Sequence, residues 1–139
     1  MIKTPTVSVV MITYNHEKFI EEAIHGVLMQ DCDFDIEFII ANDKSTDSTD
    51  QVITKYLNQL NIPDNINIEY TNHKENKGMI PNFVWGLQHA NGKYIALCEG
   101  DDYWTDSLKL QKQVDFLEDH DEFTGIGSNS EVLIQETKE

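Results

Sequence analysis

Apolar residues along the chain alternate between short runs and longer segments with helical spacing. Two short runs, Val7–Thr13 and Ile36–Ala41, are apolar at nearly every position and rich in β-branched residues. Such runs are typical of strands that are buried on both faces. The run Ile66–Tyr70 alternates apolar with polar positions, which indicates a strand nearer an edge. Two more segments predict a fourth strand at residues 93–98 and the start of a fifth at 124–128.

In the longer segments apolar residues recur every three or four positions, which predicts amphipathic helices. Ser48 and Gln51 have the spacing of a capping box, and Pro81 suits the first turn of a helix. Either Asp106 or Ser107 can cap the last helix. The four expected helices lie within residues 16–30, 48–60, 79–90 and 108–120.

Regular alternation of strand and helix predicts an α/β fold with a mainly parallel sheet. Right-handed crossovers lead us to expect a Rossmann-like sheet flanked by helices, with strand order 3-2-1-4. We expect one such domain over residues 1–130, followed by a polar tail at 131–139. In sheets of this kind ligands bind beyond the carboxyl ends of the strands, here near the switch point between strands 1 and 4.

Polar residues follow three of the predicted strands and are expected to meet at that edge. They are Thr13, Tyr14 and Asn15 after the first strand, Asn42 and Asp43 after the second, and Glu99, Asp101 and Asp102 after the fourth. Taken alone, Asp43 reads better as a turn or cap residue, and Tyr14 could be a packed aromatic. The acids are harder to explain as a plain turn. Clustered carboxylates suit a hard cation such as Mg²⁺ or Mn²⁺.

The net charge of −15 excludes the basic surface that nucleic-acid binding requires. All ten basic residues are lysines. An anionic small ligand therefore needs a partner that offsets the acidic charge, and a divalent cation can be the largest local charge in a site.

Several common motifs are absent from the sequence. It has no GxGxxG, P-loop, HExxH or GxSxG motif. Its five histidines read as surface or helix residues. Cys32 and Cys98 form no CxxC pair, and Cys98 is expected to be a buried free thiol in a reducing cytosol. The sequence shows neither a signal peptide nor an apolar run long enough to cross a membrane.

Three segments together resemble family-two glycosyltransferases with the GT-A fold. They are the strand-end TYN at 13–15, NDKSTD at 42–47, and the stretch from ANGKYI to the acids of EGDDYW at 90–104. The resemblance runs over nearly the whole chain in the family's order. It implies that the chain is the N-terminal, donor-binding part of a longer enzyme.

The resemblance implies roles for individual residues. Tyr14, with its neighbours Thr13 and Asn15, lies where the family packs against the nucleotide base, and Asp43 where a carboxylate accepts a hydrogen bond from that base. Lys77 and Gly78 belong to a loop that lines the nucleotide. Asp102 is the expected ligand of Mn²⁺ or Mg²⁺, and Asp101 is expected to contact the ribose or the metal. Glu99 is expected to shape the loop or touch the sugar.

The sequence departs from the family pattern at two places. The second segment reads NDKS where the family has DDGS, so Asn42 brings no charge. An inverting transfer also needs a general base, which the resemblance places beyond Glu139. The late acids Glu131, Glu136 and Glu139 match no such position.

The resemblance therefore implies inverting, metal-dependent transfer of a sugar from a nucleoside diphosphate sugar, commonly a UDP-sugar. The acceptor would be a carbohydrate or a lipid-linked hydroxyl in bacterial cell-surface polysaccharide synthesis, in the cytoplasm, with any membrane attachment made by another part of a longer protein. The alternatives are a non-catalytic nucleotide- or sugar-binding module or an inactive fragment of an enzyme. A nucleotidyltransferase is a third reading, but the loop after the first strand lacks the glycines and basic residues it would need.

Overall fold

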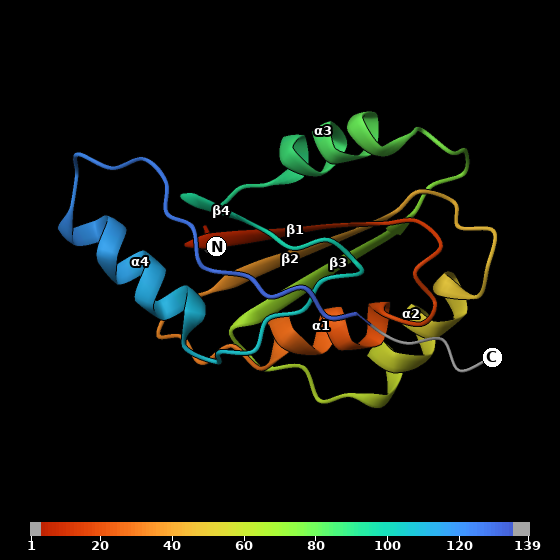
Figure 1. Ribbon diagram of the computed structural model, residues 1–139, viewed down its shortest axis with the longest axis horizontal. Coiled ribbons are helices and arrows are strands. Elements are labelled where there is room, and N and C mark those ends of the chain that lie inside the picture. Colours follow the sequence, from red (N-terminus) through yellow and green to blue (C-terminus); the bar gives the residue numbers. More distant parts are fainter. Residues whose placement is uncertain (1–3, 135–139) are drawn as a thin grey trace.

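Four parallel strands form the centre of the protein, whose computed structural model describes residues 4–134 (Figure 1). The strands are β1 (Val7–Thr13), β2 (Ile36–Asn42), β3 (Ile66–Asn72) and β4 (Tyr94–Leu97). Their order is β3-β2-β1-β4, and each neighbouring pair is parallel. The predicted α/β class, the strand order and the edge position of β3 are confirmed.

The helices cover both faces of the sheet. They are α1 (Ile20–Leu28), α2 (Thr49–Gln59), α3 (Met79–His89) and α4 (Lys109–Asp119). In Figure 1, α1 and α2 lie on one face and α3 on the other. Right-handed crossovers explain this division, because the chain moves from β1 to β3 in one direction and then returns past β1 to β4. That reversal places the switch point between β1 and β4.

Strands β1 and β2 are buried along their whole length, whereas β3 and β4 alternate in burial. The two inner strands pack between the helix layers, as their continuous apolar pattern predicted. Helix α3 approaches β1 closely at Gly86, where an added Cβ would lie 2.6 Å from Cγ1 of Val10. On the other face, Leu110 and Val114 bring α4 into the core that α1 forms with the sheet.

The expected helix starts are confirmed only in part. Pro81 lies in the first turn of α3, and Asp106 accepts a hydrogen bond from N–H of Leu108 just before α4. The capping box at Ser48 is wrong, because its side chain makes no capping hydrogen bond. Asp47 accepts the N–H of Thr49 instead, at 2.9 Å.

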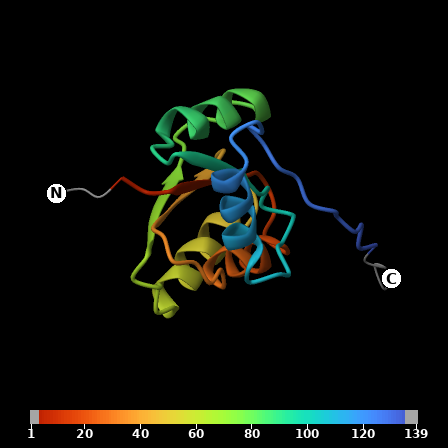
Figure 2. The same cartoon turned by 90° about the vertical axis from the view of Figure 1, so that its left-hand side faces the viewer.

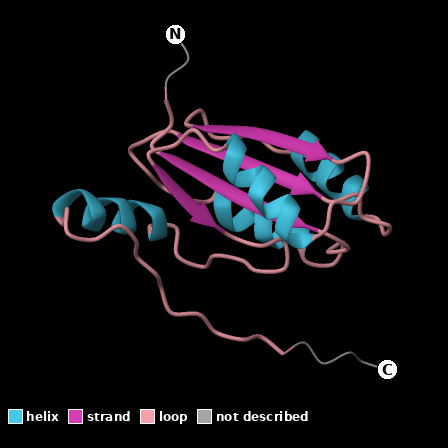
Figure 3. Ribbon diagram, turned by 90° about the horizontal axis from the view of Figure 1, so that it is seen from above, coloured by secondary structure: helices cyan, strands magenta, loops and turns pink. Residues whose placement is uncertain are grey.

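The fifth strand predicted at residues 124–128 is wrong. Residues 121–134 form no helix or strand and are exposed, and they run along the outside of the molecule (Figures 2 and 3). Nothing lies within 4 Å of a Cβ built at Gly125 or Gly127, so no neighbouring strand pairs with this segment. The boundary between the domain and the tail stays a prediction, and residues 135–139 lie outside the described residues. No helix in the described part is long and apolar enough to span a membrane.

One charged residue, Glu37, is buried inside β2. It faces Ser8 across the register of β1 and accepts a hydrogen bond from the Ser8 hydroxyl. It also accepts hydrogen bonds from the backbone and side-chain N–H groups of Asn91, at 2.9 and 2.8 Å. Burial acts to raise the pKa of Glu37, but these hydrogen bonds outweigh it and hold the pKa below its ordinary value. The carboxylate thereby joins the loop before β4 to the centre of the sheet.

We predict that Glu37→Gln lowers the free energy of unfolding at pH 7 by about 1–3 kcal/mol, since charged hydrogen bonds are lost. A carboxyl with a lowered folded-state pKa stabilises the fold above its unfolded-state pKa, and this contribution disappears as pH falls through the folded-state value. Urea unfolding should therefore show the difference between wild type and variant shrinking below about pH 4.5. Glu69→Gln, at an exposed position of β3, is the matched control. A difference that persists unchanged at pH 3 would contradict this account.

Candidate functional site

The carboxyl ends of β1 and β2 and the segments after β3 and β4 enclose a pocket of about 390 Å³. The predicted residues Thr13, Tyr14, Asp43 and Gly78 line it, together with Glu99. The other lining residues are Ile12, His16, Asn76, Met79 and Asn82. Asn15, Lys77, Asp101 and Asp102 lie next to the lining residues without being among them.

Tyr14 lines the pocket and is 44% exposed. It is therefore an open aromatic surface and is not packed into the core. An exposed aromatic ring beside a cavity is suited to stacking on a planar ligand.

Asp43 is buried, with 3% of its surface exposed. Its carboxylate accepts hydrogen bonds from the backbone N–H groups of Lys77, at 2.7 Å, and Gly78, at 2.8 Å. The Asn76 amide donates to the Asp43 backbone carbonyl. Gly78 has φ 89°, a conformation that favours glycine. Asp43 thus holds the loop before α3 against the end of β2, and Lys77 and Gly78 reach the site through their backbone.

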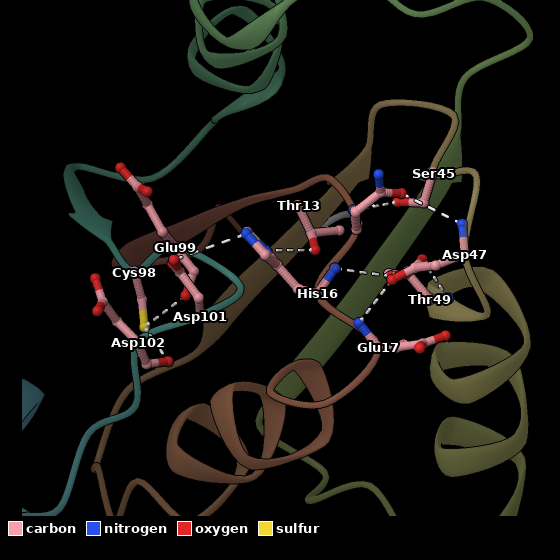
Figure 4. A network of polar contacts seen from close by, with 11 residues as sticks. Thr13, His16, Glu17, Ser45, Asp47, Thr49, Cys98, Glu99, Asp101 and Asp102 are labelled. Carbon is pink, nitrogen blue, oxygen red and sulfur yellow. Dashed lines mark hydrogen bonds and ion pairs between the residues drawn. The ribbon is translucent and has the colours of Figure 1, made fainter. Parts of the chain in front are cut away.

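Asn15 ties the loop after β1 to the loop after β2. Its side-chain carbonyl accepts the N–H groups of Thr46, at 2.8 Å, and Asp47, at 3.3 Å. Its own N–H donates to Ser45 Oγ. Glu17 adds a reciprocal pair, since its N–H donates to Asp47 and its carboxylate accepts the N–H of Ser48. The STD sequence at residues 45–47 therefore supplies much of the contact that holds the loops after β1 and β2 together (Figure 4).

Asn42, which replaces the family's first acid, is fully buried. Its amide donates to the Tyr70 hydroxyl at 3.1 Å, and its carbonyl accepts the N–H and the hydroxyl of Ser45. The Tyr70 hydroxyl in turn donates to Asp50. An aspartate here could accept but not donate, so the asparagine suits the buried position.

The acids after β4 lie on an exposed loop, residues 99–102, which we call the acid loop and which packs against the end of β1. Gly100 donates its N–H to the carbonyl of Ile12, and a Cβ at Gly100 would lie 2.6 Å from Thr13 Oγ1. The carboxylates of Glu99, Asp101 and Asp102 point in different directions (Figure 4). Among the described residues no three acidic, histidine or cysteine side chains gather as a metal site. Hard carboxylate oxygens on an open loop nevertheless fit Mg²⁺ or Mn²⁺, which are held by one or two carboxylates when phosphate oxygens complete the shell.

The prediction of a buried free thiol at Cys98 is confirmed. The thiol lies below the acid loop, 3.6 Å from the backbone carbonyl of Asp102. Burial, helped by the charge of Asp102, raises its pKa to about 12. A thiol with so high a pKa stays protonated, so it packs beneath the loop and is a poor nucleophile.

The reading of the histidines as surface or helix residues is wrong for His73, and it gave no role to His16, which is partly exposed. His16 lines the pocket, and His73 is buried beside it with Nε2 2.8 Å from the side-chain oxygen of Asn82. The one sequence signal for His16 was its position directly after TYN. Asn76, Met79 and Asn82 were also missed, because they belong to a loop and a helix whose approach to the pocket depends on Asp43 and on packing.

The family model for Glycosyl transferase family 2 matches residues 8–130. An uncharacterized protein of Mycobacterium tuberculosis is 46% identical over 120 residues, covering 84% of this chain and 33% of that protein. The putative teichuronic acid biosynthesis glycosyltransferase TuaG of Bacillus subtilis is 35% identical over 113 residues, covering 81% of this chain and 42% of TuaG. The chain thus spans between a third and somewhat under half of these relatives.

Two solved structures are similar in fold. TarS residues 1–349 of S. aureus, in complex with UDP, has a TM-score of 0.66 and 29% identity, over 84% of this chain and 33% of that one. The mannosyltransferase PcManGT of Pyrobaculum calidifontis, in complex with GDP-Man and Mn²⁺, has a TM-score of 0.69 and 24% identity over the same shares. The strand-end motifs and the sheet topology agree with the family model, which matches residues 8–130. The chain belongs to glycosyl transferase family 2.

Proposed function

We propose that this chain is the donor-binding part of an inverting, metal-dependent glycosyltransferase that uses a nucleoside diphosphate sugar, with a UDP-sugar as the first candidate. The observation that carries the proposal is the meeting of Tyr14, Asp43 and Glu99 of the acid loop around one pocket. The UDP bound to TarS and the GDP-Man and Mn²⁺ bound to PcManGT support the class of donor.

Each part of the pocket has a role that its chemistry suits. The exposed ring of Tyr14 stacks on the base. The carboxylate of Asp43 accepts two backbone N–H groups, yet each carboxylate oxygen can accept more than one hydrogen bond, so it can also face the base. The remaining proposed nucleotide contacts come from two places. Thr13 and Asn15 lie on either side of Tyr14, and Lys77 and Gly78 contribute the backbone of the loop that Asp43 holds.

Asp102, with Asp101, would hold the divalent cation, and Asp101 would also contact the ribose. When bound, the cation offsets the negative charge that develops on the nucleoside diphosphate as the sugar leaves. This chain contains no arginine, so its own side chains offer little other positive charge for the diphosphate. The acceptor hydroxyl, on a carbohydrate or a lipid-linked molecule, would attack from the opposite face with the help of a general base.

That base is not assigned to any residue of this chain. Glu131 is exposed after α4, and Glu136 and Glu139 lie outside the described residues. Synthesis of bacterial cell-surface polysaccharide is the proposed setting, supported by the similarity to TuaG. A location in the cytoplasm stays a prediction.

We expect UDP to bind in calorimetric titrations and to bind more tightly with Mn²⁺. Asp102→Ala should lower the affinity for UDP in the presence of Mn²⁺ by at least about tenfold and so remove the gain from Mn²⁺. Even outer-shell partners of metals contribute about 10- to 100-fold to metal affinity. Glu99→Ala, on the same loop but inside the pocket lining, should retain most of the gain. Absence of any heat from wild-type protein at millimolar UDP would refute the proposal. Binding without sugar transfer by the full-length protein would favour the non-catalytic module.

Asp43→Asn is expected to weaken both the fold and UDP binding. The amide would place an N–H group where the carboxylate accepts Lys77 or Gly78, so the free energy of unfolding should fall by about 1–3 kcal/mol. Asp64→Asn, at an exposed loop position, is the matched control in urea unfolding and in UDP titration. Unchanged stability would show that the two backbone contacts contribute little.

A further inference from the structure

His16 has its backbone anchored on both sides. Its N–H donates to Thr49 Oγ1 at 2.9 Å, where the loop after β2 begins α2. Its carbonyl accepts the N–H groups of Phe19 and Ile20 at the start of α1. Since the backbone is fixed between two helix starts, the direction in which the imidazole leaves the chain is also fixed. The ring points toward Thr13 and Asp101 (Figure 4) and lines the pocket.

Both ring nitrogens of His16 face a partner. Nδ1 lies 3.0 Å from Thr13 Oγ1, and Nε2 lies 3.7 Å from Asp101 Oδ2. When the Thr13 hydroxyl donates to Nδ1, the ring hydrogen resides on Nε2 and points toward Asp101. Both ring nitrogens thus face side chains at the end of β1 and on the acid loop. His16 is also the one basic side chain among the described residues that line the pocket.

The acid loop is in direct contact with this pair of residues. A Cβ built at Gly100 would lie 2.6 Å from Thr13 Oγ1 and 2.9 Å from His16 Nδ1. The loop can therefore settle against the end of β1 only because residue 100 lacks a side chain. His16 then reaches the following residue, Asp101, whose side chain is 45% exposed and would otherwise sample several rotamers in solvent.

From this geometry we propose that His16 is a positioning residue, which fixes Asp101 relative to the end of β1 and so prepares the acid loop for the diphosphate and its cation. The inference rests on the proposed function and deepens it. His16 connects two parts of the site, because its backbone belongs to the loop pair held by Asn15 and its ring faces the acid loop. Holding a side chain in its bound conformation before binding reduces the entropy lost on binding.

The test compares two ligands that share a base but differ in charge, uridine and UDP, with Mn²⁺ present. His16→Phe keeps a planar ring but removes both nitrogens, and it should weaken UDP binding by about 2- to 10-fold, the factor expected for ordering one side chain. The affinity for uridine should stay within about twofold of wild type, because uridine lacks the diphosphate that the acid loop is proposed to bind. His25→Phe is the matched control, because His25 lies on α1 outside this pocket and contacts Tyr56.

Two amide variants separate the ring nitrogens. His16→Gln places an amide N–H near the position of Nε2 and should recover most of the UDP affinity, whereas His16→Asn reaches only the position of Nδ1 and should not. This comparison also carries the test if the phenylalanine variant fails to fold. A glutamine variant no better than the asparagine variant would overturn the proposal.

A double-mutant cycle in urea unfolding checks the link without any nucleotide. The effects of His16→Phe and Asp101→Ala should be non-additive, since the two side chains are in contact. Additive effects, an unchanged UDP affinity, or equal losses for uridine and UDP would each overturn the proposal. Failure of the wild-type protein to bind UDP would instead refute the proposed function, so the two failures are distinguishable.

Discussion

Strand β1 is hydrogen-bonded to neighbours on both edges and buried on both faces, and the rest of the structure is arranged around it. Because β2 and β4 both pair with it in parallel, their carboxyl ends emerge beside its own. The chain changes direction across the sheet at this strand, so the helices on either side leave its carboxyl end open. The pocket is a consequence of that reversal. A buried apolar strand thus determines where the polar residues after it can act.

The motif residues at this edge divide into two groups once their partners are known. One group holds loops to each other: Asn15 accepts backbone N–H groups from the loop after β2, and Asn42 uses both ends of its amide in the interior. The other group faces the pocket, with Tyr14 as its exposed aromatic member. Asp43 belongs to both, since it is buried, binds the loop before α3 and still borders the pocket. Residues that look alike in a sequence motif therefore differ in function.

Electrostatics sets the main chemical demand on the site. The protein is strongly acidic and without arginine, and three exposed carboxylates follow β4. Like charges on one short loop repel one another, so the loop is favourable only where solvent, a cation or a nearby N–H group compensates. The loop meets this condition through its exposure and through the ring of His16, whose Nε2 faces Asp101. A bound divalent cation would compensate the carboxylates most strongly, which is consistent with the donor complex proposed for this pocket.

Local sequence alone determined four of the five predicted strands, the parallel order and the edge at which polar residues gather, because periodicity and strand-end composition depend on neighbouring residues. Helix starts were less secure: Asp47 replaced Ser48 as the capping side chain through contacts with Glu17, a residue from another loop. The segment at 124–128 predicted the start of a strand, yet a strand needs a partner, and no described strand pairs with it. Only the tertiary structure decided that His16 faces Asp101, because the two residues are more than eighty positions apart in the sequence. The pairing of β1 with β4 and the fit of Gly100 against Thr13 bring them together.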